Sequence, residues 1–263
     1  MTDRRRPTGL RARTLFKGAA TALSAAVLVL ASPALAHAAP PPALPGNAGE
    51  AELRFQPAFD YDRDGCYASP AIGPDGTIAP GLKIGGDVNG NCRDLSDLEN
   101  SNSYSREKCN NGWCAYMYAL YFEKDQVSLG GGSAGHRHDW EHVVVWVRGD
   151  QVEYVSTSAH GGFAVHPRSE VLFEGSHPKV VYHKDGGSTH CFRTAAAHDD
   201  PPENHRGTWQ YPTLVGWNGY SGGLRDKLAA ADFGSALLGI KDGQFNGHLA
   251  RAKPSGIPFD PEG

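Results

Sequence analysis

Residues 135–147 constrain the fold more strongly than any other part of this 263-residue sequence. Val143–Val147 (VVVWV) is a β-branched and aromatic run of the kind that forms buried strands. The eight residues before it, Gly135–His142 (GHRHDWEH), include six that are charged or carry an imidazole. The glycine-rich run Leu129–Ala134 comes first and predicts a flexible loop. We therefore expect potential metal ligands where a loop enters a buried strand.

The spacing within this polar run has more than one interpretation. If it is a strand, alternate residues share a face, so Asp139 and Glu141 point the same way and His136 can fold in from the loop. Carboxylates with one imidazole suit a hard cation, calcium or magnesium. The alternative is a zinc peptidase, because His138, Glu141 and His142 match H-x-x-E-H, a motif that requires a helix. A third interpretation is a polar strand end with satisfied ion pairs and no ligand.

The N-terminal segment, residues 1–38, predicts a secretory signal peptide. A basic front with six Lys or Arg precedes the short apolar run Ala19–Leu30, and cleavage sites follow near Ala36 and Ala38. General secretion fits better than twin-arginine export. Residues 39–49 predict a Pro-rich leader, and residues 50–263 have the length of one domain. We expect an extracellular, soluble protein with no transmembrane segment.

The charge of the chain limits its partners. The full sequence has a formal net charge of −4, and removal of residues 1–38 leaves the remainder near −9. Such an acidic protein is a poor nucleic-acid binder, so we expect no nucleic-acid partner. It would not reach an anionic membrane by charge alone, so a membrane target must be recognised through other chemistry.

The five cysteines predict disulfides in a secreted chain. Cys109 and Cys114 bracket a turn sequence and are candidates for closing a small loop, which leaves Cys66 and Cys92 for a larger one. The sequence alone does not fix this pairing. Cys191 lies in a strand-like run and is predicted to be a buried thiol.

Strand signals recur along the chain and predict a mainly β fold. They fall at residues 115–122, 143–148, 151–156, 171–173, 179–183 and 190–194, with a hairpin turn at Gly149-Asp150. A helical pattern is confined to the C-terminal part, where Leu224, Leu228 and Ala231 share a face and Gly234 is the expected stop. We predict a single-domain, mostly antiparallel β-sandwich flanked by a few helices.

A second acidic run lies near the start of the domain. Asp60, Asp62 and Asp64 match D-x-D-x-D-G, the opening of an EF-hand calcium loop. The match stops there, because the twelfth position is Ala71 rather than Glu and no flanking helices are evident. The run predicts either a partial calcium site completed from elsewhere or an acidic surface turn.

The run Gly135–Glu141 resembles the hallmark heptad of the necrosis- and ethylene-inducing-protein-like family, the NLP proteins. The resemblance extends over most of residues 50–253, through the segments 65–72 (GCYASPAI), 115–125 (AYMYALYFEKD), 158–162 (SAHGG) and 232–236 (DFGSA). It implies a β-sandwich similar to that of the actinoporins, which agrees with the fold predicted from the strand signals.

The resemblance also implies a site. The family holds one calcium or magnesium ion in an acidic cavity, and the matching positions here are Asp125, His136, Asp139 and Glu141. His160 and His190 match further histidines implicated in activity. The spacing from Asp125 to His136 is three residues longer than in common members. The four candidate disulfide cysteines and the Asp60–Asp64 run resemble the two-disulfide subclass with an extra calcium motif.

The function that the resemblance implies is that of a secreted, monomeric cytolysin without catalytic turnover. Its target would be the sugar head group of a plant membrane sphingolipid, glycosylinositol phosphorylceramide. The alternatives are the secreted zinc peptidase, a cation-dependent carbohydrate-binding protein that does not lyse membranes, and a non-toxic family member that acts only as an elicitor.

Overall fold

The computed structural model describes residues 38–129 and 132–263, so nearly all of the predicted signal peptide lies outside the described residues. No described helix is both long and apolar enough to cross a membrane. The elements, in chain order, are α1 (Glu50–Arg54), β1 (Ala58–Tyr61), α2 (Leu95–Glu99), β2 (Asn102–Asn110), β3 (Trp113–Leu129), β4 (Gly132–Arg148), β5 (Gln151–Ala159), β6 (Gly162–Pro167), η1 (Arg168–Glu170), β7 (Phe173–Glu174), β8 (His177–Lys184), β9 (His190–Thr194), η2 (Ala197–Asp199), β10 (Thr213–Gly216), η3 (Trp217–Gly219), α3 (Leu224–Ala230) and α4 (Phe245–Ala252).

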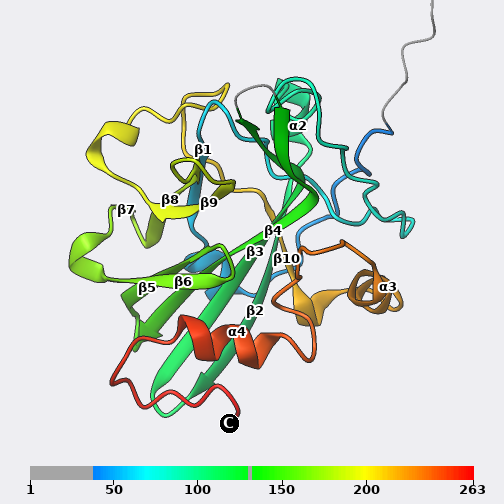
Figure 1. The fold of residues 1–263 in the computed structure, drawn as a ribbon. Helices are drawn as coiled ribbons and strands as arrows, with labels where there is room; N and C mark the ends of the chain where they lie inside the picture. Colours follow the sequence, from blue (N-terminus) through cyan, green and yellow to red (C-terminus); the bar gives the residue numbers. More distant parts are fainter. Residues whose placement is uncertain (1–37, 130–131) are drawn as a thin grey trace, which may run out of the picture. The chain divides into compact units, whose positions relative to one another are not determined.

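Two sheets account for the described strands, and the predicted mainly β fold is confirmed. The larger sheet has the order β10-β2-β3-β4-β5-β6 and is antiparallel except for the β10–β2 pair. In the smaller sheet β8 pairs with β1 in parallel and with β9 and β7 in antiparallel fashion. Figure 1 shows β1, β8 and β9 to the upper left of the long green strands of the larger sheet.

The central strands of the larger sheet are buried on both faces. In β3 the side chains of Tyr118, Leu120 and Phe122 pack toward the smaller sheet, whereas Met117 and Tyr121 pack toward the helices and the C-terminal segment. The same alternation continues in β4, so the valine run contributes to both cores. A strand with two buried faces needs a continuous apolar run, which is what residues 143–147 supply.

The β3–β4 hairpin corrects one prediction. Residues 132–134, part of the glycine-rich run that was expected to form a loop, belong to β4, which pairs with β3 from Trp113↔Arg148 to Leu129↔Gly132. The glycine-rich sequence is held in a strand by its ladder partner, because strand formation depends on context more than on intrinsic propensity. The pairing keeps one register, and it places Asp125 directly opposite His136 despite the longer spacing.

The helices are more numerous than the sequence pattern predicted. The C-terminal helical pattern is confirmed as α3, although it ends at Ala230, before the expected face residue Ala231. The prediction that helices occur only near the C-terminus was wrong, since α1 and α2 come early in the chain. Each has five residues, too few for a 3.6-residue periodicity to show. In Figure 1, α4 lies across the strands of the larger sheet.

Two disulfides form, Cys66–Cys92 and Cys109–Cys114, and Cys191 is a buried free thiol. The Pro-rich leader has no regular secondary structure but packs on the domain. Its Leu44 is buried, and the backbone N–H of Leu44 donates to the Asn102 side chain at 2.7 Å.

Candidate functional site

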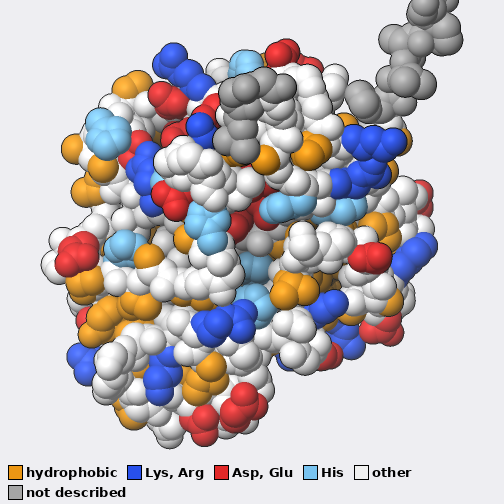
Figure 2. Space-filling model, viewed as in Figure 1, with side chains coloured by type: hydrophobic (Ala, Val, Ile, Leu, Met, Phe, Trp, Pro, Cys, Tyr) orange, Lys and Arg blue, Asp and Glu red, His pale blue; other side chains and the backbone are white. Residues whose placement is uncertain are grey.

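A cavity of about 500 Å³ opens where the two sheets, the β5–β6 turn and α4 meet. Its lining comes from β3 and β4, from residues 158–163, from Thr189 and His190, from residues 235–237, and from His248 and Arg251 of α4. In Figure 2, histidine and acidic side chains gather around a hollow in the middle of the face. The cavity collects the acidic residues of the heptad, as the resemblance implied.

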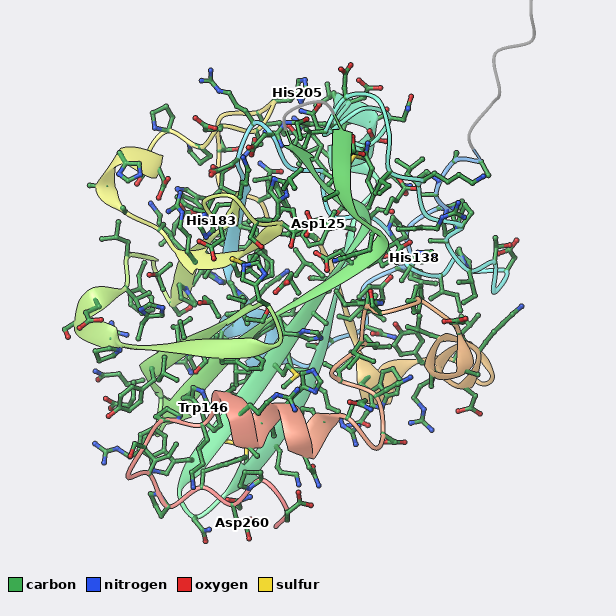
Figure 3. All side chains as sticks on the ribbon, in the orientation of Figure 1. Asp125, His138, Trp146, His183, His205 and Asp260 are labelled. Atoms are coloured by element: carbon green, nitrogen blue, oxygen red, sulfur yellow. A yellow bond between two sulfur atoms is a disulfide. The ribbon has the colours of Figure 1, made fainter. Side chains whose placement is uncertain are left out.

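The structure brings three of the four predicted cation ligands together, among them Asp125, which is labelled near the middle of the molecule in Figure 3. One ligand atom from each of Asp125, His136 and Asp139 lies within 4.8 Å of the other two. Calcium ligands lie about 2.4 Å from the ion, so two ligands on opposite sides of it are about 4.8 Å apart. The three atoms can therefore contact one ion. Glu141 lines the same cavity, but its carboxylate is engaged by Ser158.

His190 fixes Asp125 from behind. The backbone N–H of His190 donates to both carboxylate oxygens of Asp125 at 3.0 Å, and its ring Nδ1 lies 2.8 Å from Oδ1. On its other side, His190 Nε2 lies 3.3 Å from the carboxylate of Asp64. Burial alone would lower the pKa of His190, but hydrogen bonds and charges from Asp125 and Asp64 outweigh it and raise the pKa. His190 thus orients Asp125, a predicted cation ligand, and its own ring nitrogens face Asp125 and Asp64.

Asp139 and Glu141 are buried acids with one hydroxyl partner each. The Tyr182 hydroxyl donates to Asp139 at 3.0 Å, and the Ser158 hydroxyl donates to Glu141. Burial and the charge of Asp125 raise the pKa of Asp139 to about 7, while burial and the charge of Asp139 raise that of Glu141 well above its ordinary value. Several carboxylates sharing a buried pocket need a positive charge to ionise together.

His136 is oriented for a cation by its own backbone neighbour. Its Nδ1 lies 2.7 Å from the carbonyl oxygen of His138. A carbonyl can only accept, so Nδ1 carries the proton and Nε2 of the neutral ring keeps its lone pair. A hydrogen bond of this kind typically fixes the tautomer of a metal-bound histidine. Two carboxylates and one such imidazole therefore fit a divalent cation, with Asp125, His136 and Asp139 as its protein ligands.

The second predicted calcium site is not assembled in the same way. Asp60 accepts hydrogen bonds from the backbone of Glu203 and the side chain of Asn204, at 3.0 and 2.9 Å. Asp62 lies 3.7 Å from Arg193, and Asp64 contacts His190. Within the described residues these three carboxylates form no shared ligand group. Asp64 instead supports the cavity from behind, and a calcium ion at the Asp60–Asp64 run stays a prediction.

The geometry required by a zinc peptidase is absent from the described β4 segment. His138, Glu141 and His142 lie on a strand rather than a helix. His138 Nδ1 lies 2.6 Å from the Tyr121 hydroxyl, and His142 Nε2 accepts the Gly239 N–H at 2.9 Å. Each residue of the motif therefore has a separate partner. His142 borders the same cavity as Asp139 and Glu141, but its ring contacts Gly239 and His248.

Sequence reasoning missed the residues that support the ligands. Ser158 lines the cavity from β5 and Tyr182 contacts Asp139 from β8, and only the fold brings them to β4. Ser158 lies in the 158–162 segment that resembles the family, and this resemblance was the one feature of the sequence that could have identified it. His160 does line the cavity, at the tip of the β5–β6 turn.

The fold and the cavity together define a β-sandwich protein with an acidic site suited to a divalent cation. The family described as Necrosis inducing protein (NPP1) matches residues 49–252. The chain therefore belongs to this family of necrosis-inducing proteins, and the predicted NLP resemblance is confirmed.

Individual relatives agree with this assignment. NLP effector protein 10 of Phytophthora capsici is 34% identical over 206 residues, which cover 76% of this chain and 81% of that protein. Among solved structures, NLPPya in complex with glucosamine matches with a TM-score of 0.67 at 29% identity, covering 81% of this chain and 95% of that one. The non-toxic HaNLP3 protein matches with a TM-score of 0.69 at 27% identity, covering 84% and 99%.

Tyr182→Phe tests the support that β8 gives to the site. The change removes the hydroxyl that donates to Asp139 and keeps the buried ring, which stacks on Phe122 with centroids 3.8 Å apart. We expect cation affinity to fall about 10-fold, the lower end of the range for outer-shell partners. Calorimetric titration with calcium measures it. The control is Tyr211→Phe, which removes an exposed hydroxyl bonded to Glu174. Equal affinity of Tyr182→Phe and the control would contradict the assignment.

Proposed function

We propose that this protein is a secreted cytolytic toxin that uses one calcium or magnesium ion to bind the sugar head group of a plant membrane sphingolipid, glycosylinositol phosphorylceramide. Membership of a necrosis-inducing toxin family supports the toxin part. The observation that carries the cation part is the convergence of Asp125, His136 and Asp139 at the floor of an open cavity. Secretion rests on the predicted signal peptide.

The cavity has features that fit a sugar. Three protein ligands leave coordination positions of a calcium ion for water or sugar hydroxyls, since calcium takes six to eight oxygen ligands. Polar groups of His160, Ser235 and Arg251 border the remaining space and can hydrogen-bond a head group. The solved complex of the relative NLPPya with glucosamine makes an amino sugar a reasonable first ligand to test.

The rim of the cavity carries apolar side chains on the side open to solvent. Phe163 is partly buried, and Leu237 is 49% exposed. An acidic protein gains little from an anionic surface, so apolar rim groups and the captured sugar would supply its membrane contact. In this mechanism the cation ligands bind and orient the head group, and no covalent step is needed.

Dye release from lipid vesicles tests the proposal. Vesicles with glycosylinositol phosphorylceramide are compared with vesicles of phosphatidylcholine and sterol alone, each with calcium, with magnesium and with a chelator. We expect release only with the sphingolipid and a cation. Release that persists in chelator would overturn the cation dependence. Release that occurs equally without the sphingolipid would overturn the sphingolipid as the target.

A cation-dependent sugar binder without lysis is the second candidate function. The match to the non-toxic HaNLP3 protein favours it, since this structure shares the fold over 84% of the chain. The vesicle experiment separates the two functions, because this candidate binds the sphingolipid vesicles in a sedimentation assay and releases no dye.

The pH dependence of cation binding follows from the buried acid. Because burial and Asp125 raise the pKa of Asp139 to about 7, protons compete with the cation for the same oxygens. Below that pH the folded, cation-free protein holds a proton that the cation must displace. We expect the apparent affinity to be steady above about pH 8 and to fall up to about tenfold per pH unit below 7. Titration calorimetry over this range measures it, and an affinity that does not change from about pH 8 to 6 would contradict it.

A further inference from the structure

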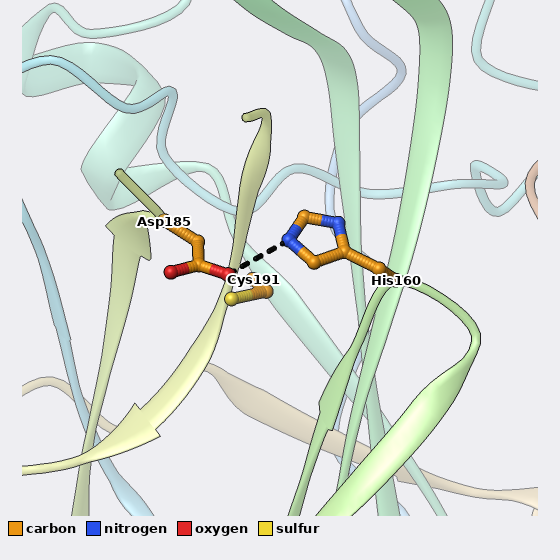
Figure 4. A group of neighbouring side chains, drawn as sticks. All are labelled: His160, Asp185 and Cys191. Atoms are coloured by element: carbon orange, nitrogen blue, oxygen red, sulfur yellow. Dashed lines mark hydrogen bonds and ion pairs between the residues drawn. The ribbon is translucent and has the colours of Figure 1, made fainter. Parts of the chain in front are cut away.

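A second group of potential metal ligands lies beside the cavity and differs from the first in chemistry. His160, Asp185 and Cys191 each offer one ligand atom, and the three atoms lie within 4.8 Å of one another. Figure 4 shows them facing each other, with His160 on one hairpin and Asp185 and Cys191 on the other. The proposed function uses neither Asp185 nor the thiol.

Local backbone geometry holds the three side chains in place. His160 and Gly161 form the two-residue turn between β5 and β6, with φ values of 48° and 83°. Both values are left-handed, as a tight hairpin turn of this type requires. Asp185 begins the β8–β9 turn, where its backbone N–H donates to Thr189 at 3.2 Å. Cys191 sits in β9 directly opposite His183. The cluster is therefore built from strand ends and short turns.

The three ligand atoms lie close enough together for one ion to bind them with small side-chain movements. His160 Nε2 lies 3.0 Å from Asp185 Oδ2, and the Cys191 sulfur lies 3.6 Å from His183 Nε2. Zinc bonds sulfur at about 2.3 Å and nitrogen or oxygen near 2.0 Å, which places tetrahedral ligands roughly 3.3–3.6 Å apart. His183 contacts the sulfur but does not belong to the group of ligand atoms that lie within 4.8 Å of one another, so water would supply the fourth ligand.

The donor set distinguishes this cluster from the cavity floor. Sulfur, imidazole and a single carboxylate are ligands of zinc-class transition metals, whereas calcium and magnesium take oxygen. The geometry points to a second metal site, formed by His160, Asp185 and Cys191, that takes zinc or a similar borderline ion. The ion would approach from solvent, because the side chains of His160 and Asp185 are 38% and 53% exposed, and buried Cys191 forms the floor.

Such an ion would connect the two sheets at the edge of the cavity. His160 lies in the β5–β6 turn of the larger sheet and also lines the cavity, whereas Asp185 lies in the β8–β9 turn of the smaller sheet and Cys191 in β9. Burial raises the pKa of the Cys191 thiol to about 12, so the free protein holds a neutral thiol there. A coordinated metal deprotonates the thiol, and the proton is released to solvent.

Cobalt(II) is the probe for this site, because it occupies zinc sites and gives a thiolate charge-transfer absorption band. Four of the five cysteines are in disulfides, so any such band reports Cys191 alone. We expect the folded wild-type protein to show the band with one equivalent of cobalt, and zinc to displace it. Cys191→Ala should abolish the band, and His160→Asn should weaken cobalt binding at least tenfold.

Two controls make the result specific. His198→Asn changes a histidine whose side chain is 78% exposed and lies outside the cluster, and it should leave the band unchanged. Asp139→Asn alters the cation site of the cavity and should also leave the band unchanged. Failure of the proposed calcium or magnesium site is therefore distinguishable from failure of the zinc-class site. Cobalt that binds without a thiolate band, or with a band that survives Cys191→Ala, would overturn the inference.

Discussion

Asp139→Asn is expected to abolish cation binding and, with it, lysis of vesicles that contain the plant sphingolipid. The substitution removes one of the two carboxylates in the three-residue ligand group while nearly keeping its shape. Loss of an outer-shell partner alone costs 10–100-fold in affinity, so loss of a charged ligand should cost at least about 100-fold. Calcium titration and dye release, measured on the same preparation, give the two readouts.

The same variant should remain folded, so that loss of calcium binding can be attributed to the missing ligand and not to unfolding of the protein. In the absence of a cation Asp139 is a buried acid with a pKa raised to about 7, so it lowers the stability of the folded state as pH rises from its ordinary pKa of about 3.9 to about 7, and the full cost is present above pH 7. Asn carries no charge, and its carbonyl oxygen can still accept the Tyr182 hydroxyl. We expect the cation-free variant to melt at the wild-type temperature or higher, whereas only the wild type is further stabilised by calcium.

Asp226→Asn is the matched control, since it makes the same chemical change at a side chain that is 84% exposed on α3. It should bind calcium and lyse vesicles like the wild type. If Asp139→Asn behaves like this control in both assays, the proposed ion site is wrong. If it loses calcium binding but keeps lysis, the site stands and the cation is not needed for membrane damage.

The parts of the fold that could be predicted from the sequence are those where the pattern of apolar residues reflects how the strand is buried. The valine run 143–147 has apolar residues at every position because β4 is buried on both faces, and this excludes a surface helix or loop. The small loop closed by Cys109 and Cys114 could be proposed because a turn sequence separates the two cysteines. In both cases the information is local, within one strand or one turn.

The parts that could not be predicted depend on partners far along the chain. Residues 132–134 are strand only because β3 offers a ladder partner for each of them, whereas their composition alone indicates a loop. Ser158 and Tyr182 approach Glu141 and Asp139 from other strands, and no spacing rule joins them. Asp125 was identified through the family resemblance, and the register of the β3–β4 ladder explains why it can act with His136.

That register depends on one glycine of the heptad, and Gly135→Ala is expected to damage both stability and cation binding. Gly135 has a φ of 133°, and a Cβ atom there would lie 2.0 Å from the carbonyl oxygen of Asp125 and 2.9 Å from the Cα of Gln126. Both are backbone atoms, so the two strands would have to separate where Asp125 faces His136. We expect a loss of about 2–4 kcal/mol in the free energy of unfolding, from backbone strain and overpacking.

Gly85→Ala separates steric exclusion from backbone strain. Gly85 has a φ of 141°, close to that of Gly135, but nothing lies within 4 Å of the position a Cβ would take. This control should lose only the conformational cost of about 1–3 kcal/mol and keep its calcium affinity. Urea unfolding and calcium titration of both variants decide the matter. Equal losses in the two variants would mean that strain alone makes glycine necessary at residue 135. A larger loss in Gly135→Ala, together with weakened calcium binding, would show that the first residue of the heptad is glycine because the ligands Asp125 and His136 need the two backbones this close.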